Sequence, residues 1–329
     1  MSTPERPDRN LAMELVRTTE AAAMASAKWQ GRGDKEAGDQ AAVDAMRSML
    51  STVEVEGVVV IGEGEKDEAP MLFNGERVGT CHEHAPQIDI AVDPVDGTTL
   101  LSEGRPGALA VIAATARGGM FDPGPAVYME KMIVGPTAKG MIDLDAPLKR
   151  NLDRIARATG KDISEVTVMM LDRPRHDQAK LEIREAGARL QLISDGDVAG
   201  GLLAAWDERP GVDLLYGIGG TPEGVSTACG VKALRGEILG RLWPRNDQER
   251  SEIVNAGLDL NQVLTTDDLV TTEDAFFACT GITTAQLVDG VTYDSHGAIT
   301  ESLVMRAKSG TIRVIRSRHR VAKMNEVLA

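Results

Sequence analysis

The chain has 329 residues, of which 42% are hydrophobic, so it is long enough to bury one large core or two closely packed subdomains. Its formal net charge of −14 disfavours general attraction to nucleic acid or anionic lipid, and an aromatic content of 3% argues against a surface for stacking bases or sugars. We therefore expect no nucleic-acid partner, and an anionic ligand must be bound by cations gathered locally.

The sequence also predicts no membrane partner. No apolar run approaches the roughly 20 residues of a membrane span, and the segment MSTPERPDRN at the start lacks the apolar core of a secretory signal. Cys81, Cys229 and Cys279 are widely separated, which predicts neither a disulfide framework nor a thiolate zinc site. These features predict a cytoplasmic enzyme.

The first part of the chain combines helices and strands. Residues 9–30 and 40–50 have apolar side chains at helical spacing, which predicts two helices. The first two strands predicted after them run directly into acidic turns that contain glycine. The predicted strands are EGVVVI (56–61), IDIAV (88–92), GALAVIAAT (107–115) and AVYMEKMIVG (126–135).

The second part alternates more regularly. Three apolar runs precede polar or charged residues and glycine, and QAKLEIREAGA predicts a helix between two of them; this pattern indicates an α/β protein. The runs are EVTVMML (165–171), LQLI (190–193) and GVDLLYGI (211–218). Because the character of the chain changes near residue 160, we expect an N-terminal subdomain, 1–160, with the acidic motifs and a C-terminal α/β subdomain, 161–329.

Carboxylates stand where the predicted strands end. Ligands of open α/β sheets bind beyond the carboxyl ends of strands, so we expect these side chains to converge. A cluster of carboxylates with no cysteine and little histidine suits Mg²⁺ or Mn²⁺, which prefer oxygen ligands, better than zinc. The carboxylates in such positions are Glu63, Glu65, Asp67, Asp93, Asp96, Asp195, Asp197 and Glu223.

The segment AVDPVDGTTL places two carboxylates close together. Asp93 and Asp96 repel each other, and bound cations would relieve that repulsion. Gly97 permits close backbone approach, and Thr98 and Thr99 are predicted to open a helix whose free N–H groups suit a phosphate. The predicted chemistry is metal-assisted phosphate hydrolysis. The alternative, an ordinary turn, is disfavoured because a second strand also ends in acids, GEGEKDE.

Two acidic residues also have a purely structural explanation. Asp39 lies near the start of the second predicted helix, where aspartate is a favoured N-cap. Glu223 follows Thr221 and Pro222, which form a natural helix start, and an acid in the first turn stabilises a helix. Both alternatives stay open at the level of sequence.

Basic residues follow the first strand of the second part. The guanidinium groups of Arg173 and Arg175 suit bidentate binding of phosphate. Their structural alternative is an ion pair with Asp172 or Asp177. His176 is assigned no role, since a lone loop histidine more often makes a structural hydrogen bond.

These motifs resemble those of a known set of enzymes. DPVDGTT resembles the DPxDGT signature of the metal-dependent, lithium-sensitive phosphatases, a superfamily that includes inositol monophosphatases and fructose-1,6-bisphosphatases. Further segments are together similar to the class II fructose-1,6-bisphosphatases of bacteria, from about residue 10 to about residue 320. They are GRGDKEAGDQAAVDAMR, VVVIGEGEKDEAPML, YMEKMIVGP, DRPRHD, SDGDVAG and YGIGGTPEG.

The resemblance implies a fold and a site. The fold would be an α/β sandwich of alternating α-β-α-β-α layers, in a homo-oligomer (dimer or tetramer) that uses Mn²⁺ or Mg²⁺. Some relatives have Glu where this chain has Asp96 and Lys where it has Arg173, and the shorter Asp96 would alter metal spacing or preference. The implied metal ligands are Asp39, Glu63, Asp93, Asp96 and Glu223. The implied substrate contacts are Asp96, Gly97, Thr98, Tyr128, Arg173, Arg175, Asp195, Asp197 and Gly220.

The implied activity is hydrolysis of a small sugar bisphosphate, D-fructose 1,6-bisphosphate, in gluconeogenesis. Metal ions would neutralise the 1-phosphate, while Thr98, hydrogen-bonded to Asp39 or Asp67, would orient the attacking water. Sedoheptulose 1,7-bisphosphate, inositol phosphates and a bisphosphorylated nucleotide are alternative substrates. A noncatalytic sugar-phosphate sensor is disfavoured, because a sensor needs no group such as Thr98 to orient water.

Overall fold

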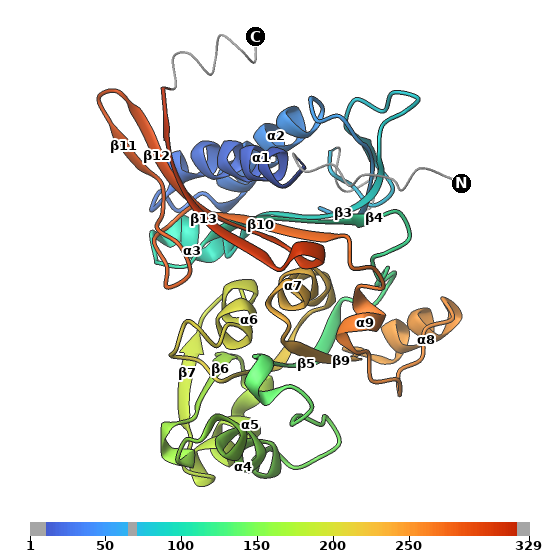
Figure 1. Ribbon diagram of the computed structural model, residues 1–329, viewed down its shortest axis with the longest axis vertical. Coiled ribbons are helices and arrows are strands. Elements are labelled where there is room, and N and C mark those ends of the chain that lie inside the picture. The colour runs from blue at the N-terminus through green and yellow to red at the C-terminus, as the bar shows by residue number, and fades with distance from the viewer. Residues whose placement is uncertain (1–10, 65–70, 321–329) are drawn as a thin grey trace.

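The computed structural model describes residues 11–64 and 71–320 and shows five layers (Figure 1). Two helices cover the outer face of a large sheet, two more lie between that sheet and a smaller one, and a further pair covers the outer face of the smaller sheet. The α-β-α-β-α order that the resemblance implied is therefore confirmed.

The larger sheet has eight strands and carries the first acidic motifs. Its order is β11-β12-β10-β4-β3-β1-β2, with β13 paired to β12. The pair β1 and β3 is parallel, whereas the other pairs are antiparallel. The strands are β1 (Glu56–Ile61), β2 (Arg77–Val78), β3 (Gln87–Asp96), β4 (Leu109–Ala116), β10 (Ala275–Gly281), β11 (Thr292–Asp294), β12 (Gly297–Arg306) and β13 (Thr311–His319).

The smaller sheet has five strands in the order β7-β6-β8-β5-β9. Its first three strands are parallel to one another, and β5 is antiparallel to both of its neighbours. The strands are β5 (Tyr128–Val134), β6 (Thr167–Leu171), β7 (Arg189–Ile193), β8 (Leu214–Gly220) and β9 (Glu237–Leu242).

Helices fill the other three layers. The outer pair on the large sheet is α1 and α2, the central pair is α6 and α7, and the pair on the small sheet is α4 and α5 (Figure 1). Within the described residues no helix is long and apolar enough to cross a membrane. The helices are α1 (Leu11–Ser26), α2 (Lys35–Leu50), α3 (Thr98–Glu103), α4 (Leu148–Thr159), α5 (Asp177–Glu185), α6 (Val198–Ala205), α7 (Thr221–Leu234), α8 (Asp247–Asn255) and α9 (Thr266–Leu269).

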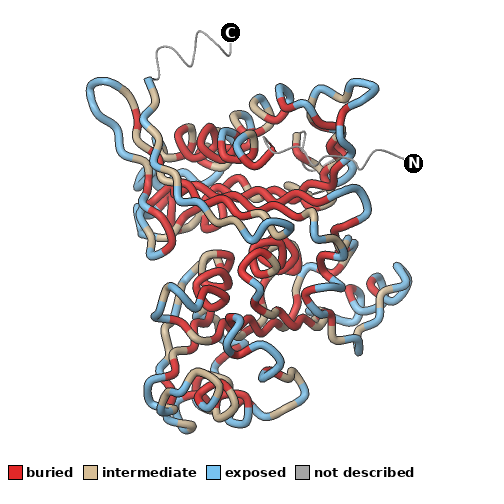
Figure 2. Tube along the Cα trace, in the orientation of Figure 1, coloured by how far each residue is buried: buried red, intermediate tan, exposed pale blue. Residues whose placement is uncertain are grey.

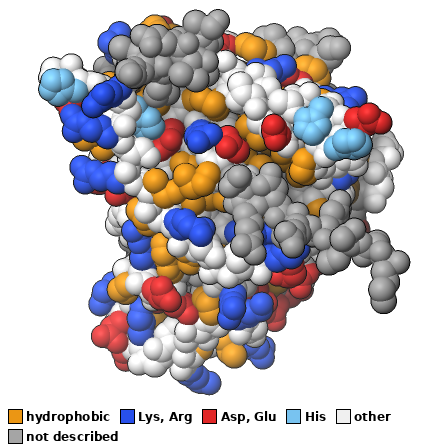
Figure 3. Space-filling view, turned by 45° about the horizontal axis from the view of Figure 1, so that its top comes forward, with side chains coloured by type: hydrophobic (Ala, Val, Ile, Leu, Met, Phe, Trp, Pro, Cys, Tyr) orange, Lys and Arg blue, Asp and Glu red, His pale blue; other side chains and the backbone are white. Residues whose placement is uncertain are grey.

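Apolar side chains between the layers form the core (Figure 2). The helix α7 is buried on nearly all sides because both sheets pack against it, which explains its lack of a polar face. On the face in Figure 3, acidic and basic side chains are interspersed with hydrophobic ones. The central layer ties the two sheets into one body.

The division between the sheets does not fall at residue 160. The strand β5, which precedes that residue, belongs to the smaller sheet through its pairing with β8 and β9. The strands β10 to β13, which come last in the chain, complete the larger sheet. Pairing between strands that are far apart in the chain decides which strands belong to each sheet. A change in local composition does not predict that pairing.

Candidate active site

Strand direction gathers the predicted site residues. Because β1 and β3 are parallel, the residues after β1 lie beside the end of β3, which brings Glu63 close to Asp93. The strands β6, β7 and β8 are also parallel, so the segments that follow them meet at one edge of the smaller sheet. The antiparallel strand β5 begins at the same edge, where Tyr128 lies opposite Gly220.

A cavity of about 230 Å³ lies between these strand ends. It is lined by every residue that the resemblance implied for substrate binding, together with two of the implied metal ligands, Asp93 and Glu223. The implied substrate residues in its lining are Asp96, Gly97, Thr98, Tyr128, Arg173, Arg175, Asp195, Asp197 and Gly220. The structure thus brings together segments that are far apart in the sequence.

A neighbouring cavity of about 330 Å³ shares part of this lining and adds Glu63. Asp39 lines neither cavity, but its charge helps to raise the pKa of Glu63 and of Asp93, so it lies near both. Asp67 and Glu65 lie outside the described residues. Four of the five implied metal ligands therefore line these two cavities, and the fifth, Asp39, lies near two of the four.

Burial and mutual repulsion raise the pKa values of carboxylates in this cluster. Burial, and next the charge of Asp39, raises the pKa of Glu63 to about 7. Burial, and next the charge of Asp96, holds the pKa of Asp93 well above its usual range. The pKa values of Asp96 and Glu223 are raised by burial and then by Asp197. A cation bound at this site would stabilise the ionised form of all of these carboxylates and so lower their pKa values.

The donor set fits a hard divalent cation. Asp96 is 4% exposed, and its buried Oδ2 has no hydrogen-bond partner among the described residues. Such an atom suits a cation, since buried carboxylate oxygens are otherwise hydrogen-bonded. Within the described residues, no group of three or more His, Cys, Asp or Glu side chains is arranged so that it could hold a metal ion. The carboxylates therefore lie near one another but are not arranged as a complete set of metal ligands.

Basic and aromatic side chains also line the 230 Å³ cavity. The guanidinium carbon of Arg175 lies 5.0 Å from the ring centroid of Tyr128, and two of its nitrogens donate to the carbonyl of Ile218 at 3.0 and 2.7 Å. Arg173 donates to the carbonyl of Ser194 at 2.6 Å and contacts Asp195 at 3.4 Å. Both arginines are thus fixed at the cavity by the strands around it.

The structural alternative for these arginines does not hold. Lys180 takes the carboxylates that were considered as their partners, at 2.6 Å from Asp172 and 2.9 Å from Asp177. His176 is buried, its Nδ1 lies 2.7 Å from the carbonyl of Leu171, and its Nε2 accepts from the N–H of Ile218 at 2.8 Å. It therefore has the structural hydrogen bonds expected of a loop histidine and faces neither cavity.

The capping alternative for Asp39 is also wrong. The N-cap of α2 is Asp34, whose carboxylate accepts from the N–H of Ala37 at 3.0 Å, because the helix begins five residues earlier than the sequence pattern indicates. Glu223 does lie in the first turn of α7, as expected, although the N-cap of that helix is Gly220 and not Thr221. Asp39 is left free to contribute to the carboxylate cluster.

The segment after Asp96 differs in part from expectation. Gly97 has a φ of 93°, a left-handed conformation that favours glycine, and α3 begins at Thr98 as predicted. The N–H of Thr99, expected to be free for phosphate, donates to Asp195 at 3.3 Å. Among the described residues the Thr98 hydroxyl has no hydrogen-bond partner, Asp39 included.

Sequence reasoning missed several residues of the site. Lys131 is 1% exposed and forms an ion pair with Asp197. Trp243 packs against Tyr128 edge-on, with ring centroids 6.4 Å apart, and Arg245 lies over the same ring at 5.5 Å. The available signal for Lys131 was a charged residue on the apolar face of a strand, in YMEKMIV; no local pattern pointed to Trp243 or Arg245.

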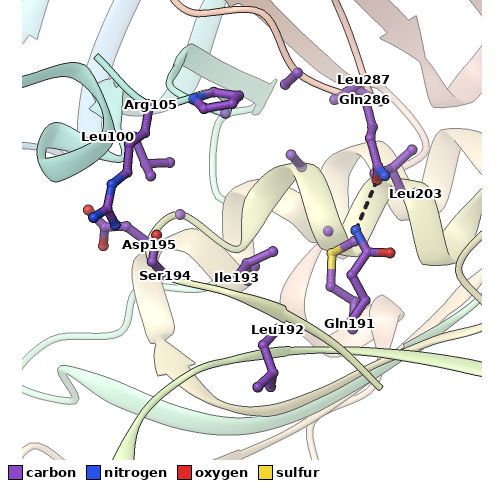
Figure 4. A pocket seen from close by; sticks show the side chains of 17 residues that line it. Leu100, Arg105, Gln191, Leu192, Ile193, Ser194, Asp195, Leu203, Gln286 and Leu287 are labelled. Atoms are coloured by element: carbon purple, nitrogen blue, oxygen red, sulfur yellow. Dashed lines mark hydrogen bonds between the residues drawn. The ribbon is translucent and has the colours of Figure 1, made fainter. Parts of the chain in front are cut away.

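A further cavity of about 330 Å³ lies on the other side of the turn at Asp195 (Figure 4). Gln191 and Gln286 face each other across it, joined by a hydrogen bond of 3.3 Å, and much of the remaining lining is apolar. Its charged lining residues are Arg105 and Asp195. It therefore suits a phosphorylated ligand less well than the cavity between the strand ends.

Carboxylates and arginines that line one cavity suit a phosphorylated ligand and cations. Comparison with known proteins agrees. The family model for bacterial fructose-1,6-bisphosphatase, glpX-encoded, matches residues 9–319. Fructose-1,6-bisphosphatase 1 class 2 of Escherichia coli (strain K12) is 47% identical over 324 residues, covering 94% of this chain and 95% of that protein. The chain belongs to this family of bacterial, class II fructose-1,6-bisphosphatases.

Other relatives include fructose-1,6-bisphosphatase class 2 of Shigella flexneri, with the same 47% identity over 94% of this chain and 95% of that protein. Among solved structures, an extragenic suppressor from Pyrococcus furiosus aligns with a TM-score of 0.28 and 16% identity, covering 59% of this chain and 68% of that one.

Proposed function

We propose that the chain hydrolyses D-fructose 1,6-bisphosphate to fructose 6-phosphate and phosphate, a step of gluconeogenesis, with Mn²⁺ or Mg²⁺ as cofactor. The observation that carries the proposal is a single cavity lined by Asp93, Asp96 and Glu223 together with Arg173 and Arg175. Membership of the family and the names of the relatives support the choice of substrate.

The metal ions would be held by Asp39, Glu63, Asp93, Asp96 and Glu223. When bound, they would neutralise phosphate oxygens and lower the pKa of water at the site. The raised pKa values and the unpartnered oxygen of Asp96 support this assignment. A bound cation would lower the pKa values and give that oxygen a partner.

The chain's own residues would bind and orient the substrate. Arg175, fixed over Tyr128 and tied to Ile218, presents its guanidinium to the phosphate that is not cleaved, and Arg173 adds a second positive charge. Asp195 and Asp197 would accept hydrogen bonds from sugar hydroxyls. Gly220 lets the substrate and Glu223 approach the backbone, because a Cβ at 220 would lie 1.7 Å from a carboxylate oxygen of Glu223.

The catalytic group would be Thr98. Thr98 lines the same cavity as Asp96, and its hydroxyl has no partner among the described residues, so it is available to bind the attacking water. Asp67, which lies outside the described residues, would orient this hydroxyl, and Asp39 or Asp67 would receive the proton of the water. The water would attack phosphorus and give a proton to that carboxylate while the bond between phosphorus and the C1 oxygen of the sugar breaks. The leaving alkoxide would take a proton from the surrounding water, to which the carboxylic acid returns its own.

The test is release of inorganic phosphate from fructose 1,6-bisphosphate by the purified chain, with EDTA or with added Mn²⁺ or Mg²⁺. We expect metal-dependent release from this substrate. A parallel panel contains sedoheptulose 1,7-bisphosphate, an inositol monophosphate and a bisphosphorylated nucleotide. Preferred cleavage of another compound would reassign the substrate, and metal-dependent binding in calorimetry without phosphate release would mean a sensor.

We also propose a cytoplasmic location and a homo-oligomer, a dimer or a tetramer. Support for the location comes from the family and from Cys81, Cys229 and Cys279, which are all free thiols in the structure. Light scattering coupled to size exclusion would measure the oligomeric state, and a monomer at micromolar concentration would contradict the second proposal.

A further inference from the structure

Lys131 is a fully buried lysine in the middle of β5, and it contacts Asp197 and Gly220, which line the 230 Å³ cavity of the candidate site. It is 1% exposed, and its Nζ lies 3.0 and 2.8 Å from the two carboxylate oxygens of Asp197. The same nitrogen donates to the carbonyl of Gly220 at 3.1 Å. Three acceptor oxygens therefore surround an ammonium group that has three protons to donate.

The neighbouring backbone leaves room for this ion pair. A Cβ at Gly219 would lie 2.1 Å from Oδ2 of Asp197 and 3.0 Å from Cε of Lys131, so a larger residue there would force the two side chains apart. The elements involved are β5, β8 and the start of α6, which bring residues from three parts of the chain to one point. The pair is thus built by the fold and is not a chance surface contact.

Lys131 divides the carboxylate cluster into two halves. We call Asp96, Asp197 and Glu223 the lysine half, and Asp39, Glu63 and Asp93 the open half. In the lysine half, burial and then Asp197 raise the pKa values of Asp96 and Glu223, while Lys131 lowers both. In the open half, the charges that act on Asp93 from the described residues are all carboxylates.

We propose that Lys131 is a positioning residue for the sugar phosphate. Its ammonium group holds the carboxylate of Asp197 at the cavity wall and supplies part of the positive charge that the lysine half would otherwise take from divalent ions. The inference rests on the proposed function, because it requires the sugar phosphate to enter the cavity that Asp197 lines.

The decisive variant is Lys131→Met, which keeps most of the side-chain length and removes the charge. Asp197 then loses its anchor, so the KM for fructose 1,6-bisphosphate at saturating Mn²⁺ should rise about tenfold or more, with kcat changed less. Calorimetric titration of the same variant with Mn²⁺, without substrate, should show binding about tenfold tighter, because a fixed positive charge beside the ligands is gone. A variant in which the site is only less well ordered would bind both the substrate and Mn²⁺ more weakly.

Three further variants separate the explanations. Asp197→Asn should raise KM by a similar factor, and Lys131→Met with Asp197→Asn should be no worse than either change alone, because the lysine acts through the aspartate. Lys232→Met is the matched control. Its side chain is also nearly buried, and its ammonium group lies 2.6 Å from Asp267. Unlike Asp197, however, Asp267 lines neither cavity of the site, so KM and Mn²⁺ affinity should stay as in the wild type.

The outcomes are distinguishable. A folded Lys131→Met variant with unchanged KM and unchanged Mn²⁺ affinity overturns the inference. If the single variant does not fold, KM is measured on the double variant, which leaves no unpaired buried charge. A KM equal to that of Asp197→Asn supports the inference, and a further large rise in KM overturns it. A wild-type chain that releases no phosphate overturns the proposed function instead, while the Mn²⁺ titrations still test the charge of Lys131.

Discussion

Asp93 and Asp96 line the same cavity because β3 bulges between them. In a regular strand, residues three positions apart point to opposite faces of the sheet. Against β4, however, Asp93 pairs with Val111 and Asp96 pairs with Leu109, so three steps along β3 match two along its partner. The extra residue, next to Pro94, which has no N–H for the ladder, turns both carboxylates to one side.

Thr98→Ala should reduce kcat by about 100-fold or more, because the variant loses the hydroxyl that would orient the attacking water. Thermal unfolding should change little, since the hydroxyl has no partner among the described residues. Steady-state phosphate release and a melting curve measure the two effects. Thr99→Ala is the matched control: its hydroxyl accepts from Lys35 at 2.9 Å and does not line the cavity. Full turnover in Thr98→Ala would end the assignment.

Asp93→Asn should change the response to metal. In EDTA the variant should unfold at a higher temperature than the wild type, because one of several mutually repelling buried charges is removed. Saturating Mn²⁺ should raise the melting temperature of the wild type more than that of the variant, since ligand binding stabilises the folded state. Melting curves with and without metal test this, and equal stabilisation of both proteins would argue against Asp93 as a ligand.

Arg175→Ala should raise the KM about tenfold or more, because a phosphate contact from a positioned guanidinium is lost. Arg175→Lys should restore little, since lysine cannot stack flat on Tyr128 and donate two bonds to Ile218 together. Arg189→Ala provides the control: this arginine also donates to a carbonyl, that of Ser164 at 2.9 Å, outside the cavity. Equal KM values in all four proteins would remove Arg175 from the substrate site.

His176 should make the protein less stable in acid. Burial lowers the pKa of His176 in the folded state, so the folded chain favours the neutral ring that bridges Leu171 and Ile218. The stabilisation is present above the unfolded pKa of about 6.5 and is lost as the pH falls toward the lower folded value. His176→Gln should therefore cost about 1–3 kcal/mol at pH 8 and progressively less below pH 6.

Urea unfolding of both proteins at a series of pH values measures this difference. A difference in free energy of unfolding that stays constant from pH 8 to pH 5 would show that the ring does not change protonation on unfolding. The prediction concerns stability alone, because His176 lies outside the lining of both cavities.

The sequence determined the local elements and the composition of the site. The acidic runs after β1 and β3, and the arginines after β6, can be read directly because alternating apolar residues mark strands and carboxyl ends of parallel strands bind ligands. The DPVDGTT motif and the segments around it were specific enough to indicate the family and, through it, the five-layer fold.

Only the tertiary structure decided which strands pair and which charges meet. Pairing of β5 with β8 takes Tyr128 to the carboxyl edge of the smaller sheet and buries Lys131 beside Asp197, although neither neighbour is near in sequence. The bulge in β3 depends on its pairing with β4. The start of α2 at Lys35, which frees Asp39 from capping, follows instead from a local signal, the Asp34 cap. Local patterns encode which face of an element is apolar, whereas the partner of that face is chosen by packing across the whole chain.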